Sequence, residues 1–226
     1  MSVKRQSKGS VKKKIFIVDD HPMMRDGLAQ MIANEPDLSV CGEAEDASEA
    51  LAQIEKLKPD LAIVDITLRS SSGLELIKDL QIRLPLVAVL VISMHDESLY
   101  AERVLRAGGR GYIMKQEGGK KLMEAIRQVL SGQTYISPKI SAKIVDAFSG
   151  RRSGNLSPVE TLTDREFEVF QLIGGGLSTK EIADKLRVSA KTVEVHRVNI
   201  KQKLNIGTAP ELIRFAVRWV ESQKPA

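Results

Sequence analysis

The sequence has one cysteine, no long apolar run and no segment of the kind that directs secretion, and each shortage excludes a class of protein. With Cys41 alone, no internal disulfide can form, which fits a reducing compartment. The longest uncharged apolar run, from Leu84 to Met94, is too short to span a bilayer and contains Pro85. Residues 1–14 carry lysines but lack the apolar stretch of a secretory signal. We therefore expect a cytoplasmic protein that does not contact a membrane.

The charges are unevenly distributed along the 226 residues, and they divide the chain better than the net charge of +5 does. Residues 1–13 carry five basic and no acidic side chains. Residues 14–135 carry 14 basic and 19 acidic side chains, whereas residues 136–226 carry 15 basic and 10 acidic ones. The chain thus joins an acidic segment to a basic one. On charge alone, a nucleic-acid-binding surface and an ordinary solvated surface explain the basic segment equally well.

In the acidic segment, apolar runs alternate five times with helical patterns. Strands are expected at 15–18, 38–44, 61–64, 86–92 and 111–114, and helices are expected to begin near Pro22, Ala47, Gly73, Glu97 and Gly118. Such alternation predicts an α/β fold with a doubly wound, five-stranded parallel sheet and helices on both faces.

Polar residues directly follow four of the expected strands. They are Asp19 with Asp20, Asp65, Ser93 and Lys115. Because the carboxyl ends of parallel strands meet along one edge, these groups are expected to lie together, and the combination suggests phosphoryl chemistry. A single aspartate at a strand end is more often a turn former or helix cap, and a single serine is more often only polar there. The combination, rather than any one residue, carries the prediction.

Clustered carboxylates at this edge would favour a cation. Each pair repels by about 4 kcal/mol at a separation of about 4 Å and an effective dielectric near 20. Hard oxygen ligands that leave room for water and phosphate favour Mg²⁺.

The basic segment is helical by pattern and follows a linker over residues 132–159, which contains a short amphipathic piece at 140–148. Two capping boxes, at 163–166 and 178–181, mark helix starts. A helix at 190–204 follows after a very tight turn, and another is expected at 209–220. This spacing is typical of a helix-turn-helix unit. We expect a basic tail at 1–13, an α/β domain at 14–131, the linker, and an all-α four-helix domain at 160–226.

Several sequence stretches together resemble one family. They are Val18-Asp-Asp-His-Pro22, Ser93-Met-His95 and Ala107-Gly-Gly-Arg-Gly-Tyr-Ile-Met-Lys115 in the first domain, and Leu162-Thr-Asp-Arg-Glu-Phe-Glu-Val, Gly176-Leu-Ser-Thr-Lys-Glu-Ile-Ala and Thr192-Val-Glu-Val-His-Arg-Val-Asn-Ile-Lys-Gln-Lys-Leu204 in the second. From about residue 14 onward the chain resembles a NarL/FixJ-type bacterial response regulator. That family joins a flavodoxin-like receiver to a LuxR-type helix-turn-helix domain.

The resemblance implies roles for the polar residues at the sheet edge. Asp20, Asp65 and the backbone carbonyl of Thr67 would bind Mg²⁺, with Asp19 helping directly or through water. Asp65 would be the nucleophile that accepts the phosphoryl group. The metal and Lys115 would neutralise charge on the transferred oxygens. Beyond this phosphotransfer to itself and the later loss of phosphate, the chain is not expected to be an enzyme.

Two further residues are implied as a switch, and one loop departs from the family pattern. The Ser93 hydroxyl would turn toward the phosphate, and Tyr112, otherwise read as a half-buried aromatic, would rotate inward and alter the face of the helix at 97–107.

The family usually has proline four residues after the phosphorylated aspartate, where this chain has Arg69. The lifetime of the phosphate therefore stays open.

Helical geometry sorts the faces of the helix at 190–204. Val193, Ile200 and Leu204 face the core, and His196 is read as a packed or capping residue. The outward face is expected to enter the major groove of DNA, with Glu194 facing a cytosine amino group and the valines facing thymine methyl groups. Lysines on this helix would contact phosphates. The predicted DNA-binding residues are Lys191, Thr192, Glu194, Val195, Val198, Lys201, Gln202 and Lys203.

The function expected from these residues and the resemblance is that of a two-component transcription factor. A histidine kinase would phosphorylate Asp65 and thereby control binding to promoter DNA, with the chain acting as a homodimer. The alternative is a DNA-binding regulator that works without phosphorylation, whose receiver is a protein-interaction or ligand-sensing platform. The last helix is a candidate pairing surface, although packing within the monomer explains its apolar residues equally well.

Overall fold

The computed structural model describes residues 12–68, 72–148 and 158–222. The basic tail up to residue 11 and the unusual Arg69 lie outside the described residues. The elements of the α/β part are β1 (Lys13–Val18), α1 (Pro22–Ala33), β2 (Leu38–Ala44), α2 (Ala47–Leu57), β3 (Leu61–Val64), α3 (Gly73–Arg83), β4 (Ala88–Ser93), α4 (Glu97–Ala107), β5 (Gly111–Met114), η1 (Lys115–Glu117) and α5 (Gly119–Leu130). They are followed by α6 (Pro138–Phe148), η2 (Pro158–Thr161), α7 (Asp164–Gly174), α8 (Thr179–Leu186), α9 (Ala190–Lys203) and α10 (Ala209–Ser222).

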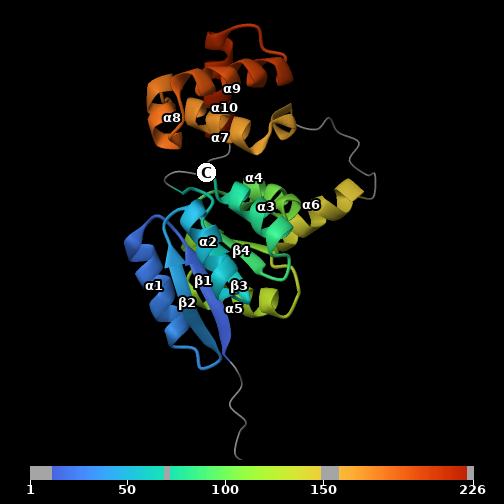
Figure 1. The fold of residues 1–226 in the computed structure, drawn as a ribbon. Coiled ribbons are helices and arrows are strands. Elements are labelled where there is room, and N and C mark those ends of the chain that lie inside the picture. The colour runs from blue at the N-terminus through green and yellow to red at the C-terminus, as the bar shows by residue number, and fades with distance from the viewer. Residues whose placement is uncertain (1–11, 69–71, 149–157, 223–226) are drawn as a thin grey trace, which may run out of the picture.

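The sheet has five parallel strands in the order β2-β1-β3-β4-β5, which confirms the predicted doubly wound fold. Val18 pairs with Val64, and Ser93 pairs with Met114, so the strands end in register along one edge. Figure 1 shows this edge at the top of the sheet, beneath the helices of the C-terminal part. The residues that follow β1, β3 and β5 are therefore brought to the same place.

One expected strand was placed too early. The run at 86–92 was expected to form the fourth strand, but β4 begins at Ala88 because Pro85 and Leu86 form a turn. Proline has no N–H to donate to the sheet, and the Leu86 side chain is 96% exposed. The strand extends instead to Ser93, which is fully buried.

Alternate side chains of each strand pack against opposite layers of helices. Ile15 and Ile17 belong to the core that lies under α1 and α5. Phe16 and Val18 belong to the core that lies under α2, α3 and α4. Both faces of a parallel sheet are thus buried, which explains why its strands are apolar throughout.

The C-terminal helices have the starts that the sequence predicts. Thr163 and Ser178 form complete capping boxes with Glu166 and Glu181, and the Ser189 hydroxyl accepts the Thr192 N–H. The turn between α8 and α9 is closed by Arg187, whose φ of 49° lies in the left-handed region. Two helices joined by so short a turn confirm the helix-turn-helix unit.

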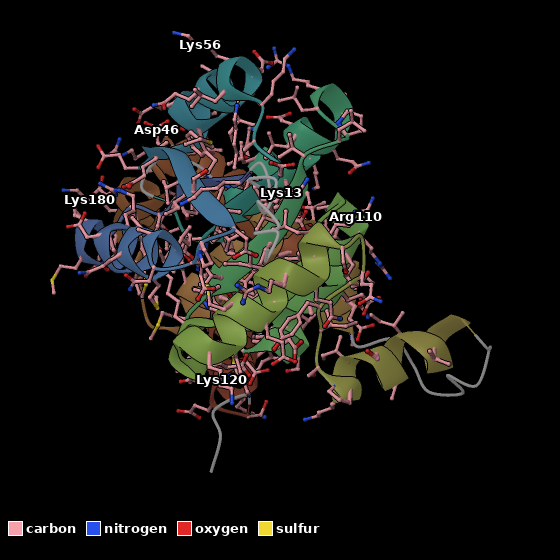
Figure 2. The ribbon with its side chains drawn as sticks, turned by 90° about the horizontal axis from the view of Figure 1, so that it is seen from below. Lys13, Asp46, Lys56, Arg110, Lys120 and Lys180 are labelled. Carbon is pink, nitrogen blue, oxygen red and sulfur yellow. The ribbon has the colours of Figure 1, made fainter. Side chains whose placement is uncertain are left out.

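The helical unit sits over the carboxyl edge of the sheet, with α7 on the side that faces the α/β part (Figure 1). Figure 2 shows the molecule from below, at the edge of the sheet where Lys13 opens β1 and Arg110 precedes β5. In that view α6 projects to one side of the α/β layers. The acidic end of the sheet and the helical unit therefore face each other.

Candidate functional site

A buried lysine joins two aspartates at the carboxyl edge of the sheet. Asp19 follows β1, Asp65 follows β3, and Lys115 follows β5. The Lys115 ammonium lies 2.6 Å from Asp19 Oδ2 and 2.7 Å from Asp65 Oδ2. The side chains are 4%, 1% and 5% exposed for Lys115, Asp19 and Asp65, so these charge-assisted bonds are shielded from water. The structure thus brings together three side chains from distant parts of the sequence, of which Asp19 and Lys115 are 96 residues apart.

The environment of Asp65 opposes its ionisation. Burial raises its pKa to about 6, although the Lys115 ammonium and the Thr67 N–H both favour the carboxylate. Burial alone would disfavour the charged form of Lys115, but the Asp65 and Asp19 carboxylates outweigh it and raise the pKa of Lys115. At neutral pH the ammonium therefore stays charged beside a carboxylate that ionises at an unusually high pH.

A cation fits beside this pair. Asp20 Oδ1 is buried and accepts no hydrogen bond, although His21 Nδ1 approaches it to 2.7 Å without hydrogen-bonding geometry. One possible ligand atom from each of Asp19, Asp20, His21 and Asp65 lies within 4.8 Å of the others. An orphaned carboxylate oxygen among further carboxylates is the donor set that a hard divalent cation takes.

Two residues that hold this loop in place were not identified from the sequence. The Arg25 guanidinium donates to the Asp19 carbonyl at 2.6 Å, and the His21 N–H donates to Asp19 Oδ1 at 2.9 Å. His21 stands inside the motif at 18–22, and its place there was the only available signal. No feature of the sequence pointed to Arg25, because its contact with the Asp19 carbonyl depends on how α1 starts after the loop.

The hydroxyl residues form a small network around His95. Ser93 Oγ accepts the His95 N–H at 3.2 Å, and the Tyr112 hydroxyl donates to the His95 carbonyl at 2.8 Å. Thr67 Oγ1 lies 3.0 Å from His95 Nε2, while the Thr67 N–H donates to Asp65 Oδ1 at 3.3 Å. Tyr112 was read as half-buried, but its side chain already points inward and is 1% exposed. The loops after β3 and β4 are therefore tied together beside Asp65.

The outward face of α9 is exposed as its periodicity predicts. Val193 and Ile200 are fully buried, whereas Val195 and Val198 are 52% and 45% exposed. Lys191, Glu194 and Gln202 are also exposed. Apolar side chains left in water next to polar ones on a helix-turn-helix indicate a face that contacts a partner.

Comparison with known families accounts for both parts of the chain. Residues 15–127 match the response regulator receiver domain, and residues 160–216 match the luxR family of bacterial regulatory proteins. The chain is 37% identical over 210 residues to the oxygen regulatory protein NreC of Staphylococcus carnosus, covering 91% of this chain and 97% of that protein.

The chain belongs to the response regulators of the NarL/FixJ type. It is a two-component response regulator with a LuxR-type DNA-binding domain.

Further relatives agree with this assignment. The chain is 34% identical to the transcriptional regulatory protein DegU of Brevibacillus brevis, over 92% of this chain and 94% of DegU. A LuxR-family response regulator from Aurantimonas sp. SI85-9A1 superimposes with a TM-score of 0.56 at 31% identity, covering 61% of this chain and 99% of that one. RcsB from Salmonella typhimurium shares the fold, with a TM-score of 0.66 at 23% identity over 92% of this chain and 98% of RcsB.

Within the DNA-binding domain of this response regulator, several of the residues predicted to contact DNA also bind other side chains of the same domain. The Lys203 ammonium lies 2.6 Å from Glu166, which is buried, so this lysine also supports the first helix of the domain. Glu194 accepts from the Thr179 hydroxyl at 2.7 Å, and Lys201 is half-buried. The Thr192 N–H and hydroxyl are both engaged with Ser189, the cap of α9.

His196 is packed, as expected. Its Nδ1 is buried without a hydrogen-bond partner, and burial lowers its pKa. Over residues 12–68, 72–148 and 158–222, the groups of side chains that could hold a metal do not include it. No helix of those residues is long and apolar enough to cross a bilayer.

Proposed function

We propose that Asp65 is the phosphoacceptor of this response regulator, and that a histidine kinase phosphorylates it to control DNA binding by α9. The observation that carries the proposal is the buried Asp65 carboxylate, held 2.7 Å from the Lys115 ammonium beside a buried carboxylate oxygen of Asp20 that accepts no hydrogen bond. A nucleophile, a fixed positive charge and an open oxygen ligand together suit phosphoryl transfer.

Magnesium would be held by Asp20, Asp65 and the Thr67 carbonyl, with Asp19 contributing directly or through water. Bound there, it would neutralise charge on the phosphoryl oxygens and orient the group for attack. An Asp65 oxygen forms the new bond to phosphorus as the bond from phosphorus to the donor breaks and the donor leaves with the electron pair. Lys115 donates hydrogen bonds to the phosphoryl oxygens, and the Ser93 hydroxyl turns to donate another.

The DNA-binding part of the proposal places α9 in the major groove. Val195 and Val198 would meet thymine methyl groups, Glu194 would accept from cytosine, and lysines would contact phosphates. The residues involved are Lys191, Thr192, Glu194, Val195, Val198, Lys201, Gln202 and Lys203. The DegU relative is named a transcriptional regulatory protein, which agrees with a promoter as target.

The active form is proposed to be a homodimer in the cytoplasm. On α10, Leu212 and Ala216 are buried in the core of their own domain, whereas Ile213 and Phe215 are 42% and 37% exposed. The exposed pair makes this helix the candidate pairing surface, and the buried pair does not contribute to it.

Phosphorylation and DNA binding can be tested together. Incubation with acetyl phosphate and Mg²⁺ is expected to place acid-labile phosphate on the chain and to raise its affinity for a selected DNA duplex in a gel-shift titration. If the duplex binds with the same affinity whether or not the chain is labelled, the alternative of a phosphorylation-independent regulator is favoured. If wild type takes up no label at all, the role of Asp65 fails.

Magnesium binding should depend on pH through Asp65. Its pKa of about 6 means that the protonated form predominates below that pH, and a metal must then displace the proton. Since the ionised fraction falls about tenfold per pH unit below the pKa, we expect the affinity for Mg²⁺ to be about tenfold lower at pH 5 than at pH 7.5. Isothermal calorimetry at the two pH values measures this ratio. Equal affinities would show that Asp65 is not a ligand.

A further inference from the structure

A side chain of α8 holds the one acidic residue of α9. The Thr179 hydroxyl donates to Glu194 Oε1 at 2.7 Å. Thr179 is the first residue of α8, directly after the Ser178 cap, and Glu194 lies in the second turn of α9. The hydrogen bond therefore joins the two helices of the helix-turn-helix unit at the face that is proposed to read DNA.

A cation also approaches the same oxygen atom. Arg197 Nε lies 3.8 Å from Glu194 Oε1, and the side chains of Arg197 and Glu194 are 12% and 58% exposed. Both contacts involve Oε1, whereas none of the residues that the structure describes donates a hydrogen bond to Oε2. The carboxylate is thus anchored to the protein through one oxygen, and the other oxygen is left as an acceptor.

The anchored carboxylate lies on an open face of the helical unit. Val195 and Val198 on the same face are 52% and 45% exposed. Figure 1 shows α9 on the side of this unit that is turned away from the sheet. The α/β part of the chain therefore does not cover the residues that would contact a duplex.

A single acceptor oxygen in the major groove distinguishes the four bases. Guanine presents two acceptors there and thymine presents a carbonyl oxygen, so both repel a carboxylate. Cytosine and adenine each offer an amino group, but in adenine the N7 acceptor lies beside that group. Oε2 of Glu194 should therefore favour cytosine over the other three bases.

The contact with Thr179 affects this choice because an unanchored glutamate has alternatives. Its side chain has several rotatable bonds, whose freedom is lost when the carboxylate docks on a base. Lys191 lies one turn earlier on the same helix, and the phosphates of DNA repel an anion, so an unanchored Glu194 would turn toward Lys191 and away from the groove. A carboxylate that is fixed before binding has already lost this freedom.

We propose that Thr179 is a positioning residue for base recognition, which fixes Glu194 so that it accepts from a cytosine amino group. The inference rests on the proposed function, in which α9 enters the major groove with Glu194 facing cytosine. Thr179 does not contact the base itself. Its hydroxyl proton is used by Glu194, so Thr179 acts on the choice of sequence through that carboxylate.

Selection of duplexes from a randomised library by the full chain tests this role. Wild type should select cytosine at one position of the site, and Glu194→Ala identifies that position because the preference for cytosine is lost there. Thr179→Val keeps the shape of threonine without its hydroxyl and should lower the preference for cytosine at least about fivefold. Thr179→Ser keeps the hydroxyl and should keep the preference.

Anisotropy titrations separate positioning from a merely structural role. Thr179→Val should bind the selected duplex more weakly than wild type does, but should bind duplexes with another base at that position as wild type does. Thr161→Val is the matched control, since the Thr161 hydroxyl donates to the Pro158 carbonyl at 2.6 Å in the same domain but outside the helix-turn-helix. It should leave every affinity unchanged. Equal weakening of all duplexes by Thr179→Val would show that its hydroxyl contacts phosphate or supports the fold, and would overturn the proposal.

A double variant shows whether the two residues act as one unit. In a Glu194→Ala background, Thr179→Val should change the base preference no further, and a further change would contradict the proposal. If Glu194→Ala selects the same sites as wild type, the base-reading role in the proposed function fails. If Glu194→Ala loses the cytosine and Thr179→Val keeps it, only the positioning role of Thr179 fails, so the two failures are distinguishable.

Discussion

Asp65→Asn is expected to abolish acid-labile phosphate incorporation from acetyl phosphate, to below a hundredth of the wild-type level. The amide has nearly the shape of the carboxylate but is neither a nucleophile for phosphorus nor an anionic ligand for Mg²⁺. The Lys115 ammonium would still be held by Asp19 at 2.6 Å, so the pocket keeps its positive charge. Radiolabelling followed by acid and base treatment of the product measures the loss.

Asp60→Asn is the matched control, because it removes a carboxylate just before β3 instead of just after it. Asp60 lies 2.7 Å from the Lys13 ammonium at the opposite edge of the sheet and should not affect the chemistry. We expect this variant to label as wild type does. If Asp65→Asn labelled equally well, the phosphoacceptor would have to be another residue.

The stability of Asp65→Asn separates lost chemistry from lost folding. The folded state raises the pKa of Asp65 from 3.8 to about 6, so the folded protein binds the proton more tightly than the unfolded chain does. The contribution of this proton to the free energy of unfolding is fully present below about pH 3.8, and it is lost as the pH rises through about 6. The amide in Asp65→Asn does not titrate in this pH range, so the variant does not lose this contribution. Urea unfolding should therefore show Asp65→Asn gaining stability relative to wild type between pH 4 and pH 7.

The sheet and the positions of its polar groups were predictable because they depend on short-range patterns. An apolar run of four residues such as 61–64, followed at once by Asp65, places the carboxylate at the carboxyl end of a buried strand in any parallel arrangement. The starts of α7 and α8 were equally clear, since a capping box involves only residues three apart. The error at β4 was local too, and lay in counting Leu86 as strand despite Pro85.

The contact between the domains could not be predicted in the same way. Tyr100 and Gln171 are 71 residues apart, and neither belongs to a periodic pattern that would single it out. Arg103 lies on a helix with Glu102 and Arg106, where a solvated face is the ordinary expectation, yet it is nearly buried by the other domain. Docking depends on the shapes of two completed domains, so the sequence of either helix alone does not reveal it.

A second prediction of large effect concerns Gly73, the residue at which α3 begins against the backbone of Asp65 and Ile66. Its N–H donates to the Ile66 carbonyl at 2.8 Å. A Cβ at this position would lie 2.1 Å from the Asp65 carbonyl oxygen and 2.9 Å from the Ile66 Cα. Both are backbone atoms that cannot rotate aside, so the loop carrying Asp65 would have to shift.

We therefore expect Gly73→Ala to lower the free energy of unfolding by about 3 kcal/mol and to impair labelling of Asp65 as well. Gly27→Ala is the matched control: Gly27 lies inside α1 with nothing within 4 Å of its added Cβ, so alanine there should stabilise the protein by about 0.5 to 1 kcal/mol. Urea denaturation of both variants gives the comparison. If Gly73→Ala were as stable as wild type and labelled normally, the close approach of α3 to the Asp65 backbone would not be what positions Asp65.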